Sequence, residues 1–290
     1  MSTEPKSFCL SDALNVIQRG STDPINIVNR YVFTRLINLN GRNLLVCVYK
    51  EKEFLKIKVL NDNSYVDQFK TLSLMITKLF GLDDPLFFRK INIESKTYPV
   101  LTYYTGVHGY LSIFEATVQT IIGQLISANV ANSLRRNFIL KFGEFFSYKG
   151  RNYYLFPLPE LIKSLSIDKI MSIGISKLKS KAIIQISNEF VQNNLEQRLV
   201  TMNNTEEIKN TLMNFCGIGR WTSDWISLRG LRNFDVVPSG DLIIRKAFSW
   251  WLGLPTIISS TQIDSICQKK WGSYAGSVAY RIMYNYIKVQ

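Results

Sequence analysis

The sequence predicts an α+β fold, with a small antiparallel sheet domain at the amino end followed by an all-helical body of two subdomains. Between residues 31 and 60, β-branched and aromatic residues alternate with polar ones, and Asn/Gly turns separate the runs, as is typical of strands. After about residue 110 the apolar spacing changes to that of helices. We therefore expect a sheet domain over residues 1–108, a helical domain over 109–230 and a second helical subdomain over 231–290.

Taken in order, the elements follow from local pattern. Strands are predicted in the runs VFTRLINL, LLVCVY and FLKIKVL. A helix is predicted over residues 65–81, and the segment TYPVLTYYTGVHGY forms a bridge into the body. Pro157, Pro159 and Gly174 mark the limits of short helices. Three apolar helical faces are predicted, namely Phe114, Val118, Ile121, Ile122 and Leu125; Ile208, Leu212 and Phe215; and Ile244, Phe248 and Trp251.

Length and charge bound the kind of protein. The chain has 290 residues, 46% of them apolar, so it can bury a core. Its 35 Lys and Arg against 22 Asp and Glu give a formal charge of +13, which favours nucleic acid or an anionic membrane surface as partner. The start MSTEPKSFCLSD lacks an apolar signal core, and the apolar stretches are short, so we expect a soluble intracellular protein.

The reactive side chains exclude several kinds of site. The four cysteines, at 9, 47, 216 and 267, lie far apart without a CxxC pair, and His108 is the only histidine in the sequence. This distribution argues against a zinc site, an iron–sulfur cluster, a disulfide framework and a mechanism that needs a catalytic histidine.

A Gly-Ile-Gly turn lies in the stretch NFCGIGRWTSDWISLRG. Gly217 and Gly219 would join a helix that ends near Phe215 to one that begins near Trp221, and glycines permit conformations and close approaches denied to other residues. The amides at the start of the second helix, with Arg220 beside them, suit a phosphate of DNA. The alternative is a turn that only connects two helices.

Asp241 follows Pro238, Ser239 and Gly240 and precedes the apolar helix LIIRKAFSWWLG. A fixed carboxylate there can stabilise positive charge that develops on a substrate and can orient or deprotonate a water. Asp is equally a good N-cap, and the two roles are compatible. Asp235 and Asp224 are weaker candidates, expected at surface or capping positions.

Trp221 and Trp225 are spaced i, i+4 and share a helix face with Leu228. Such a stripe is commonly core packing. Two indoles near a carboxylate also suit the wall of an aromatic pocket, where a cationic ligand would gain cation–π attraction.

These residues resemble the helix-hairpin-helix (HhH-GPD) DNA glycosylases, and among them 3-methyladenine DNA glycosylase II. The resemblance rests on FEATVQTIIGQLISANVA, FPLPE, GISKLKSKA, CGIGRWTSDWISLRG and VPSGD, and covers about residues 110–290. The strand-rich first hundred residues agree with the family's amino-terminal sheet domain. Cys216 and Ala275 depart from the alkylbase enzymes, which carry Pro and often Arg there, and WGSYAG is closer to the 8-oxoguanine DNA glycosylases.

The resemblance also implies roles for individual residues. Asp241 is then the catalytic carboxylate, Leu125 fills the gap left by the flipped nucleotide, and core burial of Leu125 is the alternative. The base pocket would be formed by Trp221, Trp225, Tyr274, Tyr280 and Met283. DNA contacts would come from Gln124, Leu125, Gly217, Gly219, Arg220, Thr222, Ser239 and Gly240. The family's structural monovalent cation would bind the backbone carbonyls of Phe215 and Ile218, with Thr211 or Leu212 as further ligands, and no other cofactor is implied.

The implied activity is hydrolysis of a damaged, alkylated purine from double-stranded DNA by a monomer, leaving an abasic site. Bifunctional relatives carry a lysine nucleophile just after the hairpin glycines. Trp221 occupies that place, and Lys246 is the remaining candidate amine. A bifunctional 8-oxoguanine-type glycosylase and lyase, and a DNA-binding protein without chemistry, stay open as alternatives. Membrane-surface binding is disfavoured because the basic residues are scattered.

Overall fold

The computed structural model describes the chain except residues 1–9, 19–22, 53, 63–68, 88–92 and 94–105. Its amino-terminal part contains a four-stranded antiparallel sheet with the strands in sequential order. The strands are β1 (Ile27–Asn29), β2 (Val32–Leu39), β3 (Arg42–Glu51) and β4 (Phe54–Val59). The predicted α+β class and the three predicted strand runs are confirmed.

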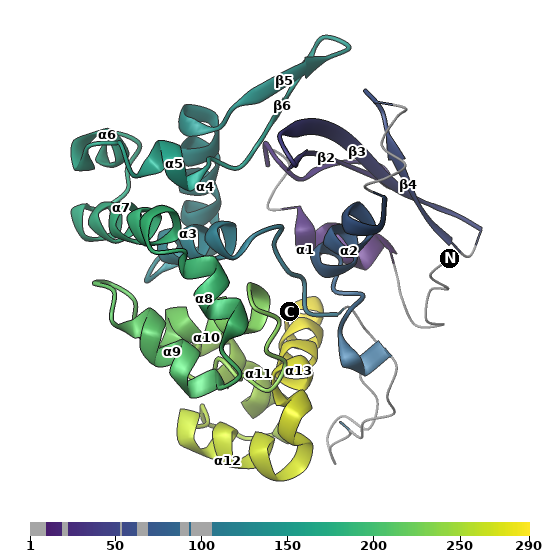
Figure 1. Cartoon of the computed structure of the whole chain (residues 1–290). Coiled ribbons are helices and arrows are strands. Elements are labelled where there is room, and N and C mark those ends of the chain that lie inside the picture. Colours follow the sequence, from purple (N-terminus) through teal and green to yellow (C-terminus); the bar gives the residue numbers. More distant parts are fainter. Residues whose placement is uncertain (1–9, 19–22, 53, 63–68, 88–92, 94–105) are drawn as a thin grey trace.

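Two helices, α1 (Leu10–Ile17) and α2 (Phe69–Leu79), cover one face of this sheet (Figure 1). Alternate residues of β2, such as Phe33 and Ile37, face these helices, because side chains of a strand point to opposite faces in turn. The α1 helix was not predicted from sequence. The amino-terminal end of the predicted helix 65–81, and most of the predicted bridge at 97–110, lie outside the described residues.

The other face of the sheet is covered by a hairpin of β5 (Phe145–Tyr148) and β6 (Arg151–Tyr154), which extends from the helical body (Figure 1). Leu36 and Leu45 of the sheet pack here with Leu155. The prediction of an all-helical body is therefore wrong at this point. The aromatic run FFSYKGRNYY forms strands because Lys149 and Gly150, both at positive φ, close a tight turn.

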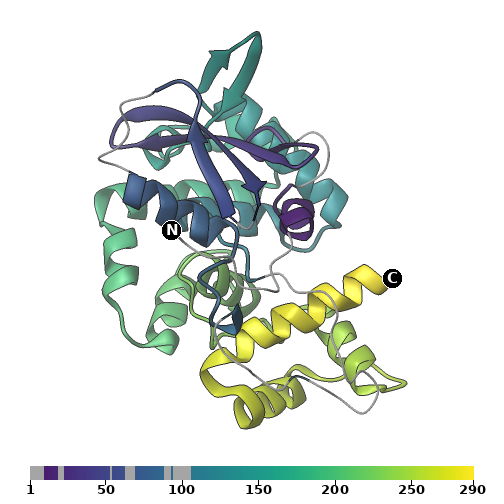
Figure 2. The same cartoon turned by 90° about the vertical axis from the view of Figure 1, so that its right-hand side faces the viewer.

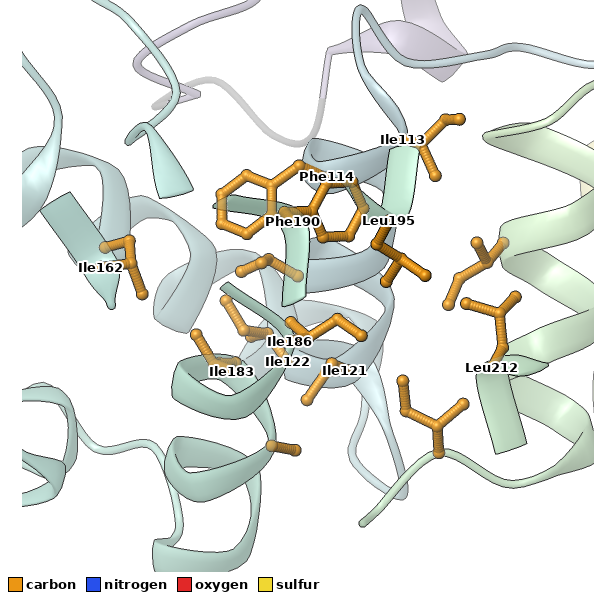
Figure 3. Close-up of a cluster of buried hydrophobic side chains, with 14 of the residues drawn as sticks. Ile113, Phe114, Ile121, Ile122, Ile162, Ile183, Ile186, Phe190, Leu195 and Leu212 are labelled. Carbon is orange, nitrogen blue, oxygen red and sulfur yellow. The ribbon is translucent and has the colours of Figure 1, made fainter. Parts of the chain in front are cut away.

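The body is built on the buried helix α3, which packs against α4, α7 and α10. Its core contains Phe114, Ile121, Ile186 and Leu212 (Figure 3). The helices of the body are α3 (Ile113–Gly123), α4 (Ala128–Phe142), α5 (Pro159–Ile162), α6 (Ile167–Met171), α7 (Lys177–Gln192), α8 (Leu195–Thr201), α9 (Thr205–Met213) and α10 (Arg220–Arg229).

Helices α11 (Leu242–Leu252), α12 (Ser260–Trp271) and α13 (Ala275–Val289) lie together at the end of the molecule opposite the β5–β6 hairpin (Figures 1 and 2). Phe248, Trp251 and Trp271 fill the core between them. Short 3₁₀ segments occur at η2 (Pro85–Phe87) and η3 (Gly272–Tyr274). The predicted domain limits at residues 108 and 230 stay a prediction.

A buried ion pair ties the sheet to the body. Arg35 of β2 donates to Glu115 of α3 at 2.6 Å, and both side chains are almost fully buried. Arg35 also donates to Asn26, and Gln119 donates to Glu115, so the charges are embedded in hydrogen bonds. Among the described residues, no helix is long and apolar enough to cross a membrane.

Candidate active site

Helices α9 and α10 form the predicted hairpin. Helix α9 ends at Met213, two residues earlier than predicted, and α10 begins at Arg220. The Ile218 amide donates to the Phe215 carbonyl at 3.0 Å and closes the turn. Gly219 is the N-cap of α10 and has no side chain to cap the helix, so the first amides of α10 keep their hydrogen-bonding capacity for another partner.

The two hairpin glycines serve different needs. Gly217 has φ +80°, a left-handed conformation that a side chain disfavours. Gly219 has φ −99°, which any residue adopts, and a Cβ at this position would meet no atom of the protein within 4 Å. Nothing inside the described part of the molecule therefore requires glycine at 219, and the space beside it is open.

Arg220 and Thr222, two predicted DNA contacts, occupy different surroundings. The Arg220 side chain is exposed, and its guanidinium lies 3.5 Å from Asp264 and 3.8 Å from Asp224. Thr222 is buried and accepts a hydrogen bond from Gln124 Nε2 at 2.7 Å. The Gln124 amide thus donates inside the protein. The DNA contacts predicted for Gln124, Arg220 and Thr222 stay predictions.

Asp241 is the N-cap of α11, as one of the sequence interpretations held. Its Oδ1 accepts the backbone amides of Ile243 at 2.7 Å and Ile244 at 3.4 Å. Its Oδ2 accepts the indole N–H of Trp221 at 2.8 Å and of Trp225 at 3.1 Å. These four donors hold both oxygens of the carboxylate in place, and an ionised carboxylate matches them because it only accepts hydrogen bonds.

The tryptophans therefore do more than fill a core, which was the alternative interpretation. Both are half-buried, whereas Leu228 on the same helix is fully buried. Their indole N–H groups meet at one carboxylate oxygen, so α10 and α11 are joined at the candidate catalytic group. A half-buried indole pair beside an immobile carboxylate offers an apolar wall and a negative charge at the same place.

Tyr280 and Met283 of α13 belong to the same apolar cluster as Trp225. The Trp225 and Tyr280 rings pack edge to face with centroids 6.5 Å apart. The Tyr280 hydroxyl lies 3.4 Å from Nδ1 of the buried His108. Burial, with Arg229 and Arg232 nearby, holds the pKa of His108 well below its usual range, so the imidazole is neutral at pH 7.

Tyr274 is placed differently from the other predicted pocket residues. It lines a cavity of about 1050 Å³ together with Arg220, Asp235 and Asp264, and neither Asp241 nor the two tryptophans take part in this lining. Its predicted role in a base pocket therefore finds no support in the geometry and stays a prediction.

Leu125 lies outside α3, in a left-handed conformation with φ +54°, and its side chain is 104% exposed. The interpretation of Leu125 as a core residue is wrong, because α3 ends at Gly123 and the chain turns before the apolar face could continue. A fully exposed leucine beside the hairpin is available to enter a nucleic acid.

The loop before Asp241 is tightly turned. Ser239 is buried, and the Asp241 amide donates to the Pro238 carbonyl at 2.9 Å. Gly240 is exposed, and a Cβ there would meet nothing within 4 Å. Gly240 thus resembles Gly219 in leaving open space next to the site.

The weaker candidates have structural surroundings. Asp235 is exposed and accepts from Thr205 at 3.2 Å. Asp224 was expected at the surface or at a cap, and this is wrong, since it is buried and lies 3.3 Å from Lys209. Burial raises the pKa of Asp224 to about 6 although Lys209 lies beside it. Its position on α10 gave no sequence signal of burial.

Sequence reasoning missed Lys179 of α7. Its Nζ donates to the carbonyls of Ile122 at 2.9 Å and Gln124 at 2.7 Å, at the end of α3. Burial and the nearby Arg135 lower the pKa of Lys179. Its motif GISKLKSKA was noticed, but a lysine that caps another helix carries no local signature.

A model of the HhH-GPD superfamily, described as base excision DNA repair proteins, matches residues 118–273, more than half of the chain. The chain belongs to this superfamily. DNA-3-methyladenine glycosylase from Bacillus subtilis is 27% identical over 97% of this chain and 96% of its own length. DNA-3-methyladenine glycosylase 2 from Escherichia coli is 28% identical over 58% of this chain and 56% of its own length.

Solved structures of HhH-GPD-like proteins share the fold of the whole chain. The 3-methyladenine DNA-glycosylase from Archaeoglobus fulgidus superposes with a TM-score of 0.85 at 24% identity, covering 99% of this chain and 97% of that one. The Clostridium acetobutylicum 8-oxoguanine glycosylase/lyase, in complex with double-stranded DNA, gives 0.72 at 18% identity, covering 98% and 92%. These likenesses show the fold, including its amino-terminal sheet.

Proposed function

We propose that this HhH-GPD protein is a DNA glycosylase that hydrolyses the N-glycosidic bond of an alkylated purine in double-stranded DNA and leaves an abasic site. The observation that carries the proposal is the Asp241 carboxylate, held by two backbone amides and two indole N–H groups beside half-buried aromatic rings. The names of the Bacillus subtilis and Escherichia coli relatives support the alkylated substrate.

The chemistry follows from this carboxylate. When the bond between C1′ and the base nitrogen breaks, its electron pair goes to the base, and a cationic alkylated purine leaves as a neutral molecule. The positive charge left on the sugar faces Asp241, whose negative charge is fixed before the reaction starts. Water then adds to C1′ and releases its proton to solvent. Because both carboxylate oxygens already accept N–H groups, the main role of Asp241 is electrostatic.

In this proposal, two elements bind DNA: the α9–α10 hairpin, and Leu125, which acts as a wedge in the duplex. The free amides of α10, with open space at Gly219, receive a phosphate at a helix N-terminus. Leu125 enters the duplex where the nucleotide leaves it, which lowers the cost of keeping that nucleotide extrahelical. The formal charge of +13 adds affinity that falls as salt rises. The protein acts as a monomer in this scheme.

Water is the nucleophile in this proposal because, in the part of the chain that the structure describes, tryptophan and not lysine lies just after the hairpin glycines. Trp221 stands there, and its indole is bonded to Asp241. Lys246 lies on α11 about 140° around the helix and about 7.5 Å along it from Asp241, which is a different side of the helix from the N-cap.

We propose that the hairpin carbonyls hold the monovalent cation that the family resemblance implies. Phe215 O accepts the Ile218 amide and keeps a second lone pair for a further partner. Phe215 and Ile218 would hold the ion, which would supply positive charge near the phosphate.

The test is release of free base from methylated duplex DNA by the wild type and by Asp241→Asn. Asn caps a helix as well as Asp, so the cap is kept, while the charge and one of the two hydrogen-bond acceptors are lost. We expect alkali-dependent strand breaks from the wild type and base release at least about 100-fold slower in the variant.

Other outcomes would select the alternatives. Strand breaks without alkali, together with a covalent complex trapped by borohydride, would establish a lyase. Binding of DNA without base release, from methylated DNA and from duplexes with hypoxanthine, ethenoadenine or 8-oxoguanine, would show a protein that only binds.

A further inference from the structure

The loop that carries Leu125 has an unusual position. Helix α3 ends at Gly123, and two residues later Leu125 stands in the left-handed region with its side chain wholly in solvent. No packing of the leucine side chain holds this conformation, which non-glycine residues adopt only when their surroundings enforce it. The constraint must therefore come from the backbone and from the neighbouring residues.

Two cationic side chains cap the end of α3. Lys179 Nζ reaches from α7 to the carbonyls of Ile122 and Gln124. Arg135 reaches from α4 with Nε and Nη2 at 3.0 and 2.8 Å from the Gln119 carbonyl. The last carbonyls of a helix, here that of Ile122, lack internal partners and carry partial negative charge, so Lys179 satisfies the helix end from which the loop departs, while Arg135 adds positive charge one turn before it.

The Gln124 side chain connects the same loop to the hairpin. Its amide nitrogen donates to the Gly217 carbonyl and to the Thr222 hydroxyl, both at 2.7 Å. One side chain thus joins the residue before Leu125 to the turn and to the first helical turn of α10. Lys179 holds the backbone of Gln124 from one side, and the hairpin holds its side chain from the other.

We propose that Lys179 and Gln124 are positioning residues that keep Leu125 ready for insertion and couple it to the hairpin. This rests on the proposed glycosylase function. A wedge that must displace a base works best if it is ordered beforehand, since otherwise the cost of ordering it is added to the cost of unstacking the base. We call the contacts of Lys179 and Gln124 with the loop and the α9–α10 hairpin the brace. The hairpin fixes the position of the DNA backbone, and the brace holds Leu125 in a fixed position relative to it. Lys179 acts on the loop and not on a phosphate.

The experiment compares Lys179→Met and Gln124→Leu with the control Lys181→Met, which removes an exposed charge from the same helix. Each variant receives the same methylated purine in two duplexes, one with the base paired and one with the base opposite a gap, where little unstacking is needed. We expect the two brace variants to release the paired base at least about tenfold more slowly, and the unpaired base within about threefold of the wild type. The control should match the wild type on both.

A second readout does not depend on chemistry. The fluorescence of 2-aminopurine placed next to an abasic analogue should rise when wild-type protein binds, because insertion of Leu125 unstacks the neighbouring base. The rise should be smaller at saturating Lys179→Met, with the thermal midpoint of each variant measured alongside. Three results would overturn the proposed role of Lys179 and Gln124. These are an equal loss of base-release rate on both duplexes, an equal loss of rate in Lys181→Met, or a fluorescence rise in Lys179→Met as large as that of the wild type. Absence of base release by the wild type with a normal fluorescence response would overturn the proposed function alone.

Discussion

Gly217 and Gly219 lie in one turn, yet their replacement by alanine should have opposite consequences. Gly217 adopts φ +80°, so alanine there must take the left-handed conformation at a cost of about 1–2 kcal/mol. The added Cβ would lie 3.4 Å from Ala182 Cβ, an ordinary contact, so the cost is conformational. At Gly219 the Cβ meets open space. A poorer N-cap costs about 0.5–1 kcal/mol, and the stiffer unfolded chain returns about 0.4–1 kcal/mol, so the stability should barely change.

The effect on DNA binding should be the reverse. A methyl group at position 219 would keep a phosphate from the first amides of α10. Loss of one hydrogen bond to a charged group costs about 1.5–3 kcal/mol, which is a roughly 10- to 150-fold weaker Kd. Gly217→Ala should bind DNA nearly normally at a temperature where it is folded.

Urea unfolding gives the stabilities, and fluorescence anisotropy with an abasic-analogue duplex at one fixed salt concentration gives the affinities. The reasoning would be refuted if Gly219→Ala bound DNA within twofold of the wild type, or if it unfolded at lower urea than Gly217→Ala.

Substitutions at four further positions test other parts of the molecule. Glu115→Ala leaves the Arg35 charge buried without its partner and should cost about 3–5 kcal/mol in urea unfolding, so a loss below about 1 kcal/mol would contradict the interdomain role of the pair. Asp241→Ala should lose base release and about 1 kcal/mol of stability from the helix cap, whereas Asp241→Asn should lose base release and keep the cap. Both variants remove the acceptor of the indole N–H groups of Trp221 and Trp225, so thermal unfolding of the two variants reports the cap separately from the charge. Leu125→Ala should leave the unfolding midpoint unchanged, because the side chain is wholly exposed, while release of a paired base slows. An equally slower release of a base opposite a gap would contradict the role of Leu125 as a wedge. Burial raises the pKa of Asp224 to about 6, above its unfolded value of about 4, so folding favours the protonated form. The stability from this protonation is complete below pH 4 and is lost as pH rises through 6. The free energy of unfolding of Asp224→Asn should therefore rise relative to that of the wild type by up to about 3 kcal/mol between pH 4 and 7, and parallel curves of stability against pH would contradict this.

Local pattern was sufficient where a residue's role depends on its near neighbours. The strands of the sheet follow from alternation, and the N-cap at Asp241 follows from an aspartate between a Pro/Gly turn and an apolar helix. The hairpin follows from two glycines between two periodic segments. The boundaries were less certain, since α9 ends at Met213 and not near Phe215.

Pattern failed where the helical period was carried past a helix end. Leu125 continues the spacing of Phe114 to Ile122, but the chain leaves the helix at Gly123, so the same leucine is fully exposed. The β5–β6 hairpin was missed because its aromatic residues match two different environments, with Phe146 against the sheet and Phe145 in solvent.

The sequence by itself determined the fold class, the hairpin, the family resemblance and Asp241 as the candidate carboxylate, because each depends on residue types at short spacing. Only the tertiary structure decided that Trp221 and Trp225 donate to the same oxygen of Asp241, and that Lys179 caps the loop of Leu125. Those contacts join different helices, over separations of 20 and 16 residues for the two tryptophans and of 55 residues for Lys179 and Gln124. Their geometry is set by how the helices pack, and no local pattern of residues specifies that packing.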